Sequence, residues 1–132
     1  MSEIHSALSA FVSSRRKYEL ARTREAGRAR QAAKIKELRT VLLALGYETL
    51  SEQAAVLGLK RPTVWAMFNS DHRRGGMSSN TVKQLLAAKA APQQLKQVIR
   101  EYVSEKLAGA YGHNSSALRL FRLRAGLSSD PN

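Results

Sequence analysis

The sequence contains no cysteine, and only 6% of its residues are aromatic. The absence of cysteine excludes disulfide bonds, thiolate zinc sites and cysteine nucleophiles, and it is consistent with a reducing compartment such as the cytoplasm. With so few aromatic side chains, the chain lacks the exposed pairs that recognition of single-stranded RNA uses. No segment reaches the roughly 18 apolar residues of a membrane span, and residues 1–10 lack the apolar core of a signal peptide. These absences favour a cytoplasmic protein.

Acidic residues are also scarce: Asp and Glu total 10 against 22 Lys and Arg, so the net charge is +12. An excess of this size favours a polyanionic partner, either nucleic acid or an anionic membrane surface, over a basic surface that is merely solvated. A metal site is not expected, because the three histidines lie far apart in the sequence without acidic residues at ligand spacing. We therefore predict a binding protein that is not an enzyme and has no metal or cofactor.

The abundant residues are helix formers. Ala, Leu, Arg, Lys, Gln and Glu dominate, and β-branched runs are absent, which predicts an all-α bundle of five to six helices. Ile35, Leu38, Leu42 and Leu45 follow helical spacing and predict a buried stripe that ends before Gly46. The expected helices cover about residues 15–45, 51–57, 62–69, 81–90, 92–108 and 115–124.

Two short helices in the middle of the chain carry clear boundary signals. Thr49 and Glu52 have the spacing of a capping box at the start of the first. Gly58 suits the turn that ends this helix, because glycine adopts a positive φ without steric cost. Pro62 suits the first turn of the next helix, where its missing N–H would have no partner in any case. The pattern predicts two helices joined by a tight turn.

Three residues of this passage have a fixed spacing. Gly58 follows Ala54 by four residues, and Val64 follows Gly58 by six. A small residue lets two helices cross closely, a glycine makes the turn, and an aliphatic residue fills the gap between the helices. The passage Leu50–Asn69 resembles the helix-turn-helix of phage-repressor and Cro-like (XRE-type) DNA-binding proteins. The resemblance implies a lambda-repressor-like bundle whose second motif helix enters the major groove; an ordinary helical hairpin is the alternative.

The second helix of the motif is expected to have an inner and an outer face. A helical wheel places Val64, Met67 and Phe68 toward the core and the opposite side toward DNA. Trp65 lies on the flank, where it could pack against a neighbouring helix or meet DNA. The residues expected to reach base edges are Lys60, Arg61, Thr63, Trp65, Ala66 and Asn69.

A second set of residues is expected to contact the sugar-phosphate backbone, namely Thr49, Ser51, Gln53, Arg73 and Arg74. For Arg73 and Arg74 the resemblance implies this contact, and a solvated loop is the alternative. Gln53 departs from the family pattern, in which an aliphatic residue is more usual at this position. Between Arg15 and Arg39 ten residues are basic and three acidic, so this stretch either follows the phosphates or forms a solvated helix face.

The predicted organisation has three parts: a basic N-terminal arm or helical extension over 1–34, a helix-turn-helix domain over 35–108, and a C-terminal helix and tail over 109–132. Modules of this kind pair on two half-sites, so a homodimer is expected. Its surface would be formed by the helices from residue 92 onward and by Leu118, Phe121 and Leu123, unless these residues close the monomer core.

The function that we expect is that of a sequence-specific transcriptional regulator in a bacterium or phage, with repression favoured over activation. Its partner would be double-stranded DNA, and its location the cytoplasm, in association with the nucleoid. No membrane partner is expected. The alternative is an adaptor that binds another protein through its helix-turn-helix bundle and holds nucleic acid without sequence preference.

The first prediction concerns Arg61, a long donor at the start of the proposed recognition helix. If its guanidinium reads a guanine edge, Arg61→Ala should cost about 1–3 kcal/mol of binding free energy and relax the preference at one base pair. Titration of a set of single-base variants of the bound DNA would measure both effects. A loss of affinity with an unchanged preference would assign Arg61 to phosphate contact instead.

Overall fold

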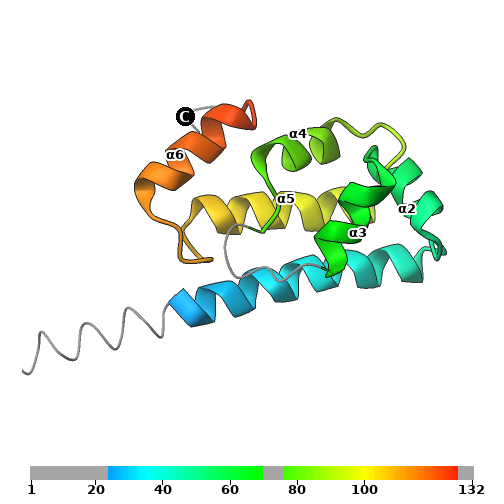
Figure 1. The fold of residues 1–132 in the computed structure, drawn as a ribbon, viewed down its shortest axis with the longest axis horizontal. Coiled ribbons are helices and arrows are strands. Elements are labelled where there is room, and N and C mark those ends of the chain that lie inside the picture. Colours follow the sequence, from blue (N-terminus) through cyan, green and yellow to red (C-terminus); the bar gives the residue numbers. More distant parts are fainter. Residues whose placement is uncertain (1–23, 70–75, 128–132) are drawn as a thin grey trace, which may run out of the picture.

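The computed structural model describes residues 24–69 and 76–127, and over these ranges it is helical with no strand (Figure 1). This confirms the all-α prediction. After an N-terminal helix, of which residues 24–44 are described, the helices are α2 (Leu50–Leu57), α3 (Arg61–Asn69), α4 (Ser79–Ala87), α5 (Gln93–Leu107) and α6 (Ser115–Arg124). In the described ranges, no helix is long and apolar enough to cross a bilayer.

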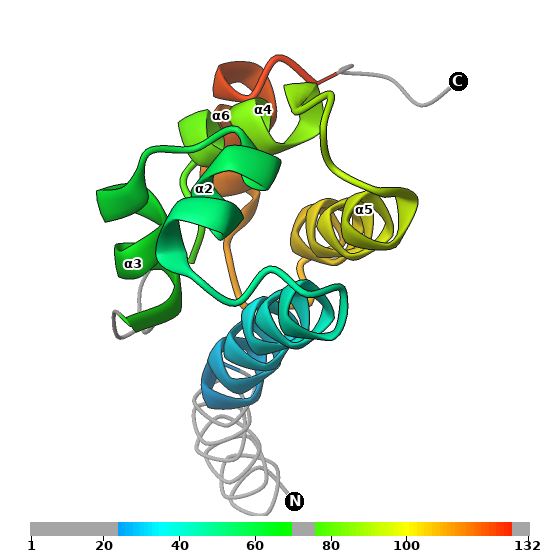
Figure 2. The same ribbon diagram turned by 90° about the vertical axis from the view of Figure 1, so that its right-hand side faces the viewer.

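The N-terminal helix and α5 lie side by side, and the four shorter helices pack on them (Figures 1 and 2). The pair α2 and α3 covers one side, while α4 and α6 lie together on another (Figure 2). An ion pair between Lys34 Nζ and Glu101 Oε2, at 3.0 Å, joins the two long helices. The two long helices thus support the shorter helices, among which α3 lies at the surface.

The apolar stripe of the N-terminal helix lies in the core. Ile35, Leu38 and Leu42 are almost completely buried, as predicted. The prediction was wrong for Leu45, whose side chain is 37% exposed. The helix ends at residue 44, and Gly46 adopts a φ of 95°, so Leu45 lies in the closing turn and points away from the stripe.

The start of α2 has the predicted capping box. Thr49 Oγ1 accepts a hydrogen bond from the Glu52 N–H at 3.1 Å, and Glu52 Oε1 accepts one from the Thr49 N–H at 3.2 Å. Two backbone donors of the first turn are satisfied in this way. Ser78 caps α4 similarly, since its hydroxyl accepts from the Thr81 N–H at 3.2 Å. Local chemistry therefore sets where these helices begin.

The core extends across both of the domain boundaries that we placed in the sequence. Gln31, which precedes the expected boundary at residue 35, is only 1% exposed. Phe121, which follows the expected boundary at residue 108, is a member of the same hydrophobic core. Gly27 lies against the backbone of Tyr111 and Gly112. The described part of the N-terminal helix and α6 therefore share the core of the helix-turn-helix.

Gly27 gives the second prediction. Alanine normally stabilises a helix interior by about 1 kcal/mol relative to glycine. Here a Cβ atom would lie 2.6 Å from the Tyr111 carbonyl carbon and 2.8 Å from the Gly112 nitrogen. Gly27→Ala should therefore lower the free energy of unfolding by about 1–3 kcal/mol, because two backbone segments must move apart. Urea denaturation would measure the change.

Thr40→Ala is the control, because Thr40 is exposed in the same helix and alanine has the higher helix propensity. That variant should match or slightly exceed the wild type in stability. A stabilising effect of Gly27→Ala would contradict the close contact between the N-terminal helix and the 109–112 turn.

Candidate nucleic-acid interface

The turn between α2 and α3 is built as the sequence predicted. Gly58 adopts a left-handed conformation with φ 68° and ψ 31°, and the Leu59 N–H donates to the Ala54 carbonyl at 3.0 Å. Ala54 and Val64 are 5% and 0% exposed, so the small and the aliphatic residue lie inside the helix pair. A Cβ atom at Gly58 would lie 3.4 Å from Ala88 Cβ, which shows how closely the turn packs against the end of α4.

The two faces of α3 also agree with the helical wheel. Val64 and Met67 are buried and Phe68 is half-buried. The opposite face is exposed and contains Arg61, Pro62, Trp65, Ala66 and Asn69. The side chain of Trp65 is 58% exposed, so it is not buried against a neighbouring helix. Thr63 is the exception among the base-edge candidates, since it is half-buried.

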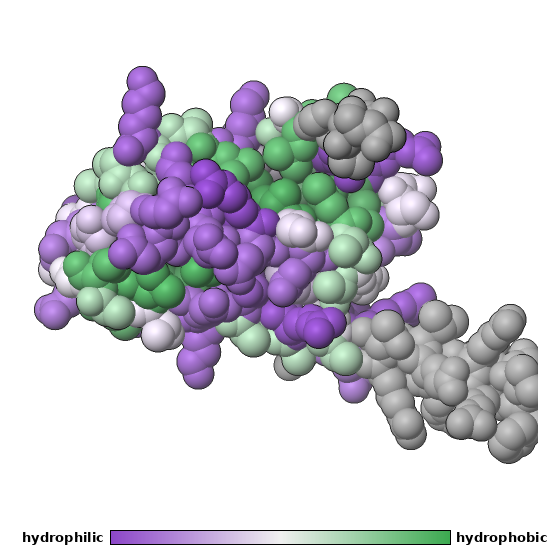
Figure 3. Space-filling model, turned by 180° about the vertical axis from the view of Figure 1, so that it is seen from behind, coloured by the Kyte–Doolittle hydropathy of each residue, from purple (hydrophilic) through white to green (hydrophobic). Residues whose placement is uncertain are grey.

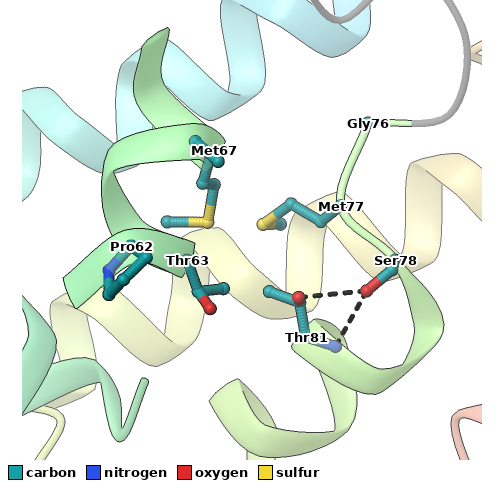
Figure 4. Close-up of a pocket in the computed structure, with 8 residues that line it drawn as sticks. Pro62, Thr63, Met67, Gly76, Met77, Ser78 and Thr81 are labelled. Atoms are coloured by element: carbon teal, nitrogen blue, oxygen red, sulfur yellow. Dashed lines mark hydrogen bonds between the residues drawn. The ribbon is translucent and has the colours of Figure 1, made fainter. Parts of the chain in front are cut away.

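Surface depressions lie on both sides of α3. One, which we call the α3–α4 groove, has a volume of about 390 Å³. It is lined by Pro62, Thr63, Ala66, Met67, Gly76, Met77, Ser78 and Thr81 (Figure 4). The side chains of Met67 and Met77 extend toward each other across it, while the Ser78 hydroxyl donates to the Thr81 hydroxyl at 3.0 Å (Figure 4). The other depression, the α2–α3 groove, is lined by Leu50, Lys60, Arg61, Pro62 and Trp65.

Charge is distributed unevenly over the described residues. Neither α3 nor α4 contains an Asp or Glu. Asp71, the acid nearest to them in the sequence, lies outside the described residues, and Glu52 is held in the capping box of α2. Glu37 and Glu101 bind Lys34 at 2.9 and 3.0 Å, and the hydrogen bond from Lys34 lowers the pKa of Glu101. Seen from behind, the molecule has hydrophilic side chains across its middle and separate apolar areas on either side (Figure 3). Neither α3 nor α4 therefore places a carboxylate on the α3–α4 groove.

A buried set of hydrogen bonds holds the segment that leads into α4. The hydroxyl of Tyr102, on α5, accepts the N–H of Met77 at 2.9 Å and donates to Gln31 Oε1 at 2.9 Å. Tyr102 and Gln31 are each 1% exposed. A Cβ atom on Gly76, whose φ is 62°, would collide with the side chains of both. The position of the α3–α4 groove thus depends on contacts with the two long helices.

Lys106 completes this buried set from the next turn of α5. Its side chain is 5% exposed, and its Nζ donates to the Met77 carbonyl at 3.4 Å. The ammonium lies 4.3 Å from the ring centre of Phe121 and 5.7 Å from that of Tyr102. Burial lowers the pKa of Lys106 to about 8. The hydrogen bonds of Lys106 and Tyr102 to Met77 and Gln31 were not predictable from the sequence, because they join residues far apart in the chain.

Some predicted contact residues lie elsewhere than expected. Gln53 is only 6% exposed, and its Nε2 donates to the Tyr47 carbonyl at 3.0 Å, so its side chain faces the interior and cannot reach a phosphate. Thr49 and Ser51 are exposed at the start of α2. Arg73 and Arg74 lie outside the described residues, as do positions 15–23 of the basic stretch.

Some of the residues expected to form the dimer surface are buried in the monomer core, and others are exposed. Phe121 is 7% exposed and belongs to the monomer core, as do the buried residues of α5. Leu118 is half-buried. Leu120 and Leu123 are 48% and 74% exposed, so α6 presents an apolar surface beside its arginines. The exposed leucines of α6 therefore form an apolar part of the expected surface that is not buried in the monomer core.

Comparisons with models of protein families, with curated proteins and with solved structures gave no match for this chain. Among residues 24–69 and 76–127, no group of three or more His, Asp or Glu side chains could hold a metal ion.

The third prediction follows from the burial of Lys106. Its pKa is about 8 in the folded protein against 10.5 for an ordinary lysine, so between these values the folded state binds fewer protons than the unfolded state. The free energy of unfolding should therefore rise with pH over this window. Burial also raises the pKa of Tyr102 and Tyr111, which opposes the rise only where unfolded tyrosines ionise, near pH 10.

Denaturant titrations between about pH 8 and about pH 9.5 would test this dependence. The wild type should gain stability across the interval relative to Lys106→Met, which has no titrating group at this position. Lys89→Met, at an exposed lysine between α4 and α5, is the control and should follow the wild type. If the wild type and Lys106→Met ran parallel, the buried ammonium would not be the cause.

Proposed function

We propose that this protein binds double-stranded DNA by placing α3 in the major groove, and that it regulates transcription, as a repressor in preference to an activator. The observation that carries the proposal is the form of α3. One of its faces is anchored in the core by Val64 and Met67, and the opposite face is exposed and bears no acidic residue. An α-helix is about 10–12 Å across with its side chains, which suits the roughly 12 Å width of the major groove.

The surroundings of α3 support the same proposal. Lys60 and Arg61 lie where α3 begins, beside the α2–α3 groove, and are placed to meet phosphates or guanine edges. On the other side, the hydroxyls of Ser78 and Thr81 border the α3–α4 groove. Both positions flank a helix that would lie in the groove, as phosphate-contacting groups do. The net charge of +12 supplies the long-range attraction to DNA.

A homodimer is part of the proposal. A single recognition helix contacts few base pairs, and pairing on two half-sites increases both affinity and specificity. The exposed leucines of α6, Leu120 and Leu123, offer the surface for this contact. The same leucines favour the second candidate function, an adaptor that binds another protein and holds nucleic acid only through charge. For either function we propose a cytoplasmic location, with the DNA-binding protein in association with the nucleoid.

The fourth prediction is the outcome of a selection from a pool of random duplexes with the full chain. Regulation requires one enriched sequence, and a dimer requires two half-sites about one helical turn apart. On the enriched duplex, Lys60→Ala should reduce the slope of log affinity against log salt by about one, because one phosphate contact is lost.

Lys83→Ala is the matched control, since it removes an equal charge from an exposed lysine of α4 that lies beside Gly126, next to α6. Its effect on the salt slope should be smaller than that of Lys60→Ala. Equal binding to every duplex, abolished by moderate salt, would refute the regulator and support the adaptor. An enriched sequence with a single half-site would retain DNA binding and refute the dimer.

A further inference from the structure

The exposed face of α3 has an apolar centre. Pro62, Trp65 and Ala66 are all exposed and lie at positions i, i+3 and i+4, which are neighbours on a helix surface. We call these three residues the apolar ridge. The indole of Trp65 is the largest part of it and is 58% exposed. Covering this indole with a partner would remove apolar surface from water, which favours binding.

The ridge stands between the two grooves, because Pro62 lines both of them. Arg61 and Trp65 line one side, and Thr63 and Met67 line the other. The centre of α3 is therefore the part that meets the floor of the major groove first when the helix enters it. Among the described residues of this region, the charged side chains of Lys60 and Arg61 lie at one end of the ridge and not along it.

Few polar side chains on this face could hydrogen-bond to base edges. Asn69, at the far end of α3, already uses its side-chain amide to donate to the Trp65 carbonyl at 2.9 Å. Thr63 is half-buried in the α3–α4 groove. Contact between the ridge and polar base edges would leave hydrogen-bonding atoms of the DNA without partners, which is unfavourable. Specificity along the centre of α3 must therefore come from apolar contact.

The major groove presents one apolar group, the methyl at C5 of a pyrimidine. We infer that the apolar ridge reads this C5 methyl, with Trp65 as the principal contact. Thymine carries the methyl in ordinary DNA, and 5-methylcytosine carries it in methylated DNA. The inference rests on the proposed function, since it requires α3 in the major groove. It makes Trp65 a residue that determines specificity and leaves attraction to the phosphates to the basic side chains.

The experiment uses the full chain and the duplex enriched in the selection. In one arm each thymine is replaced, one position at a time, by deoxyuridine, which removes the methyl and keeps every hydrogen-bonding group. In the second arm each cytosine is replaced by 5-methylcytosine. One thymine under the ridge should be sensitive, and its replacement should weaken binding about fourfold, the effect of one buried methyl group.

Two variants decide which residue is responsible. In Trp65→Ala the effect of deoxyuridine should disappear, while in Leu43→Ala, which removes another exposed large apolar side chain, on the N-terminal helix, it should persist. An increase in affinity with 5-methylcytosine that is lost in Trp65→Ala would support the inference with methylated cytosine as the source. Neither variant removes a residue of the core, so both should fold as the wild type does.

Several results would overturn the inference. Unchanged affinity in both arms, or the same deoxyuridine effect in Trp65→Ala as in the wild type, would show that the ridge does not read the methyl although DNA is bound. Failure to enrich any duplex would instead refute the proposed function itself. The two failures are therefore distinguishable.

Discussion

The entry to α4, which forms one wall of the α3–α4 groove, depends on one buried hydroxyl. Tyr102 accepts the Met77 N–H and donates to Gln31, so that α5, the N-terminal helix and the entry to α4 are joined at one atom. Leaving a buried donor or acceptor of this kind without its partner costs about 1–3 kcal/mol, which is large relative to the stability of a small protein. The collision that any Cβ atom would cause at Gly76 adds a steric constraint at the same place. The α3–α4 groove is therefore fixed from beneath, by residues that do not line its surface.

Local signals made much of the fold predictable from the sequence. The capping box at Thr49, the turn at Gly58 and the buried Val64 each depend on residues only a few positions apart, and the structure has all three. Long-range contacts were not predictable in this way. The bond between Tyr102 and Gln31 joins residues 71 positions apart, and helical spacing gives no indication of such a pair. Gln53 was misplaced although its partner, the Tyr47 carbonyl, is only six residues away, because that carbonyl becomes available only when the chain before α2 turns back.

In the proposed interface, charge and shape have separate roles. The basic side chains beside α3 would give affinity for any duplex, whereas the centre of the helix offers apolar contact that depends on the bases present. Three acidic side chains are engaged away from α3. Glu37 and Glu101 bind Lys34, and Glu52 is held in the capping box of α2. These three carboxylates are thus engaged in contacts that also stabilise the fold.

The lengths of α2 and α3 have a consequence for motion. These helices have eight and nine residues, fewer than the roughly 12–15 that an isolated helix needs to be stable in water. Their hydrogen bonds persist only because Leu57, Val64 and Met67 are buried against the rest of the core. The amide hydrogens of α3 that are bonded within the helix should therefore exchange with solvent mainly when that packing opens. The surface proposed to read DNA and the interior beneath it then open and close as a single unit.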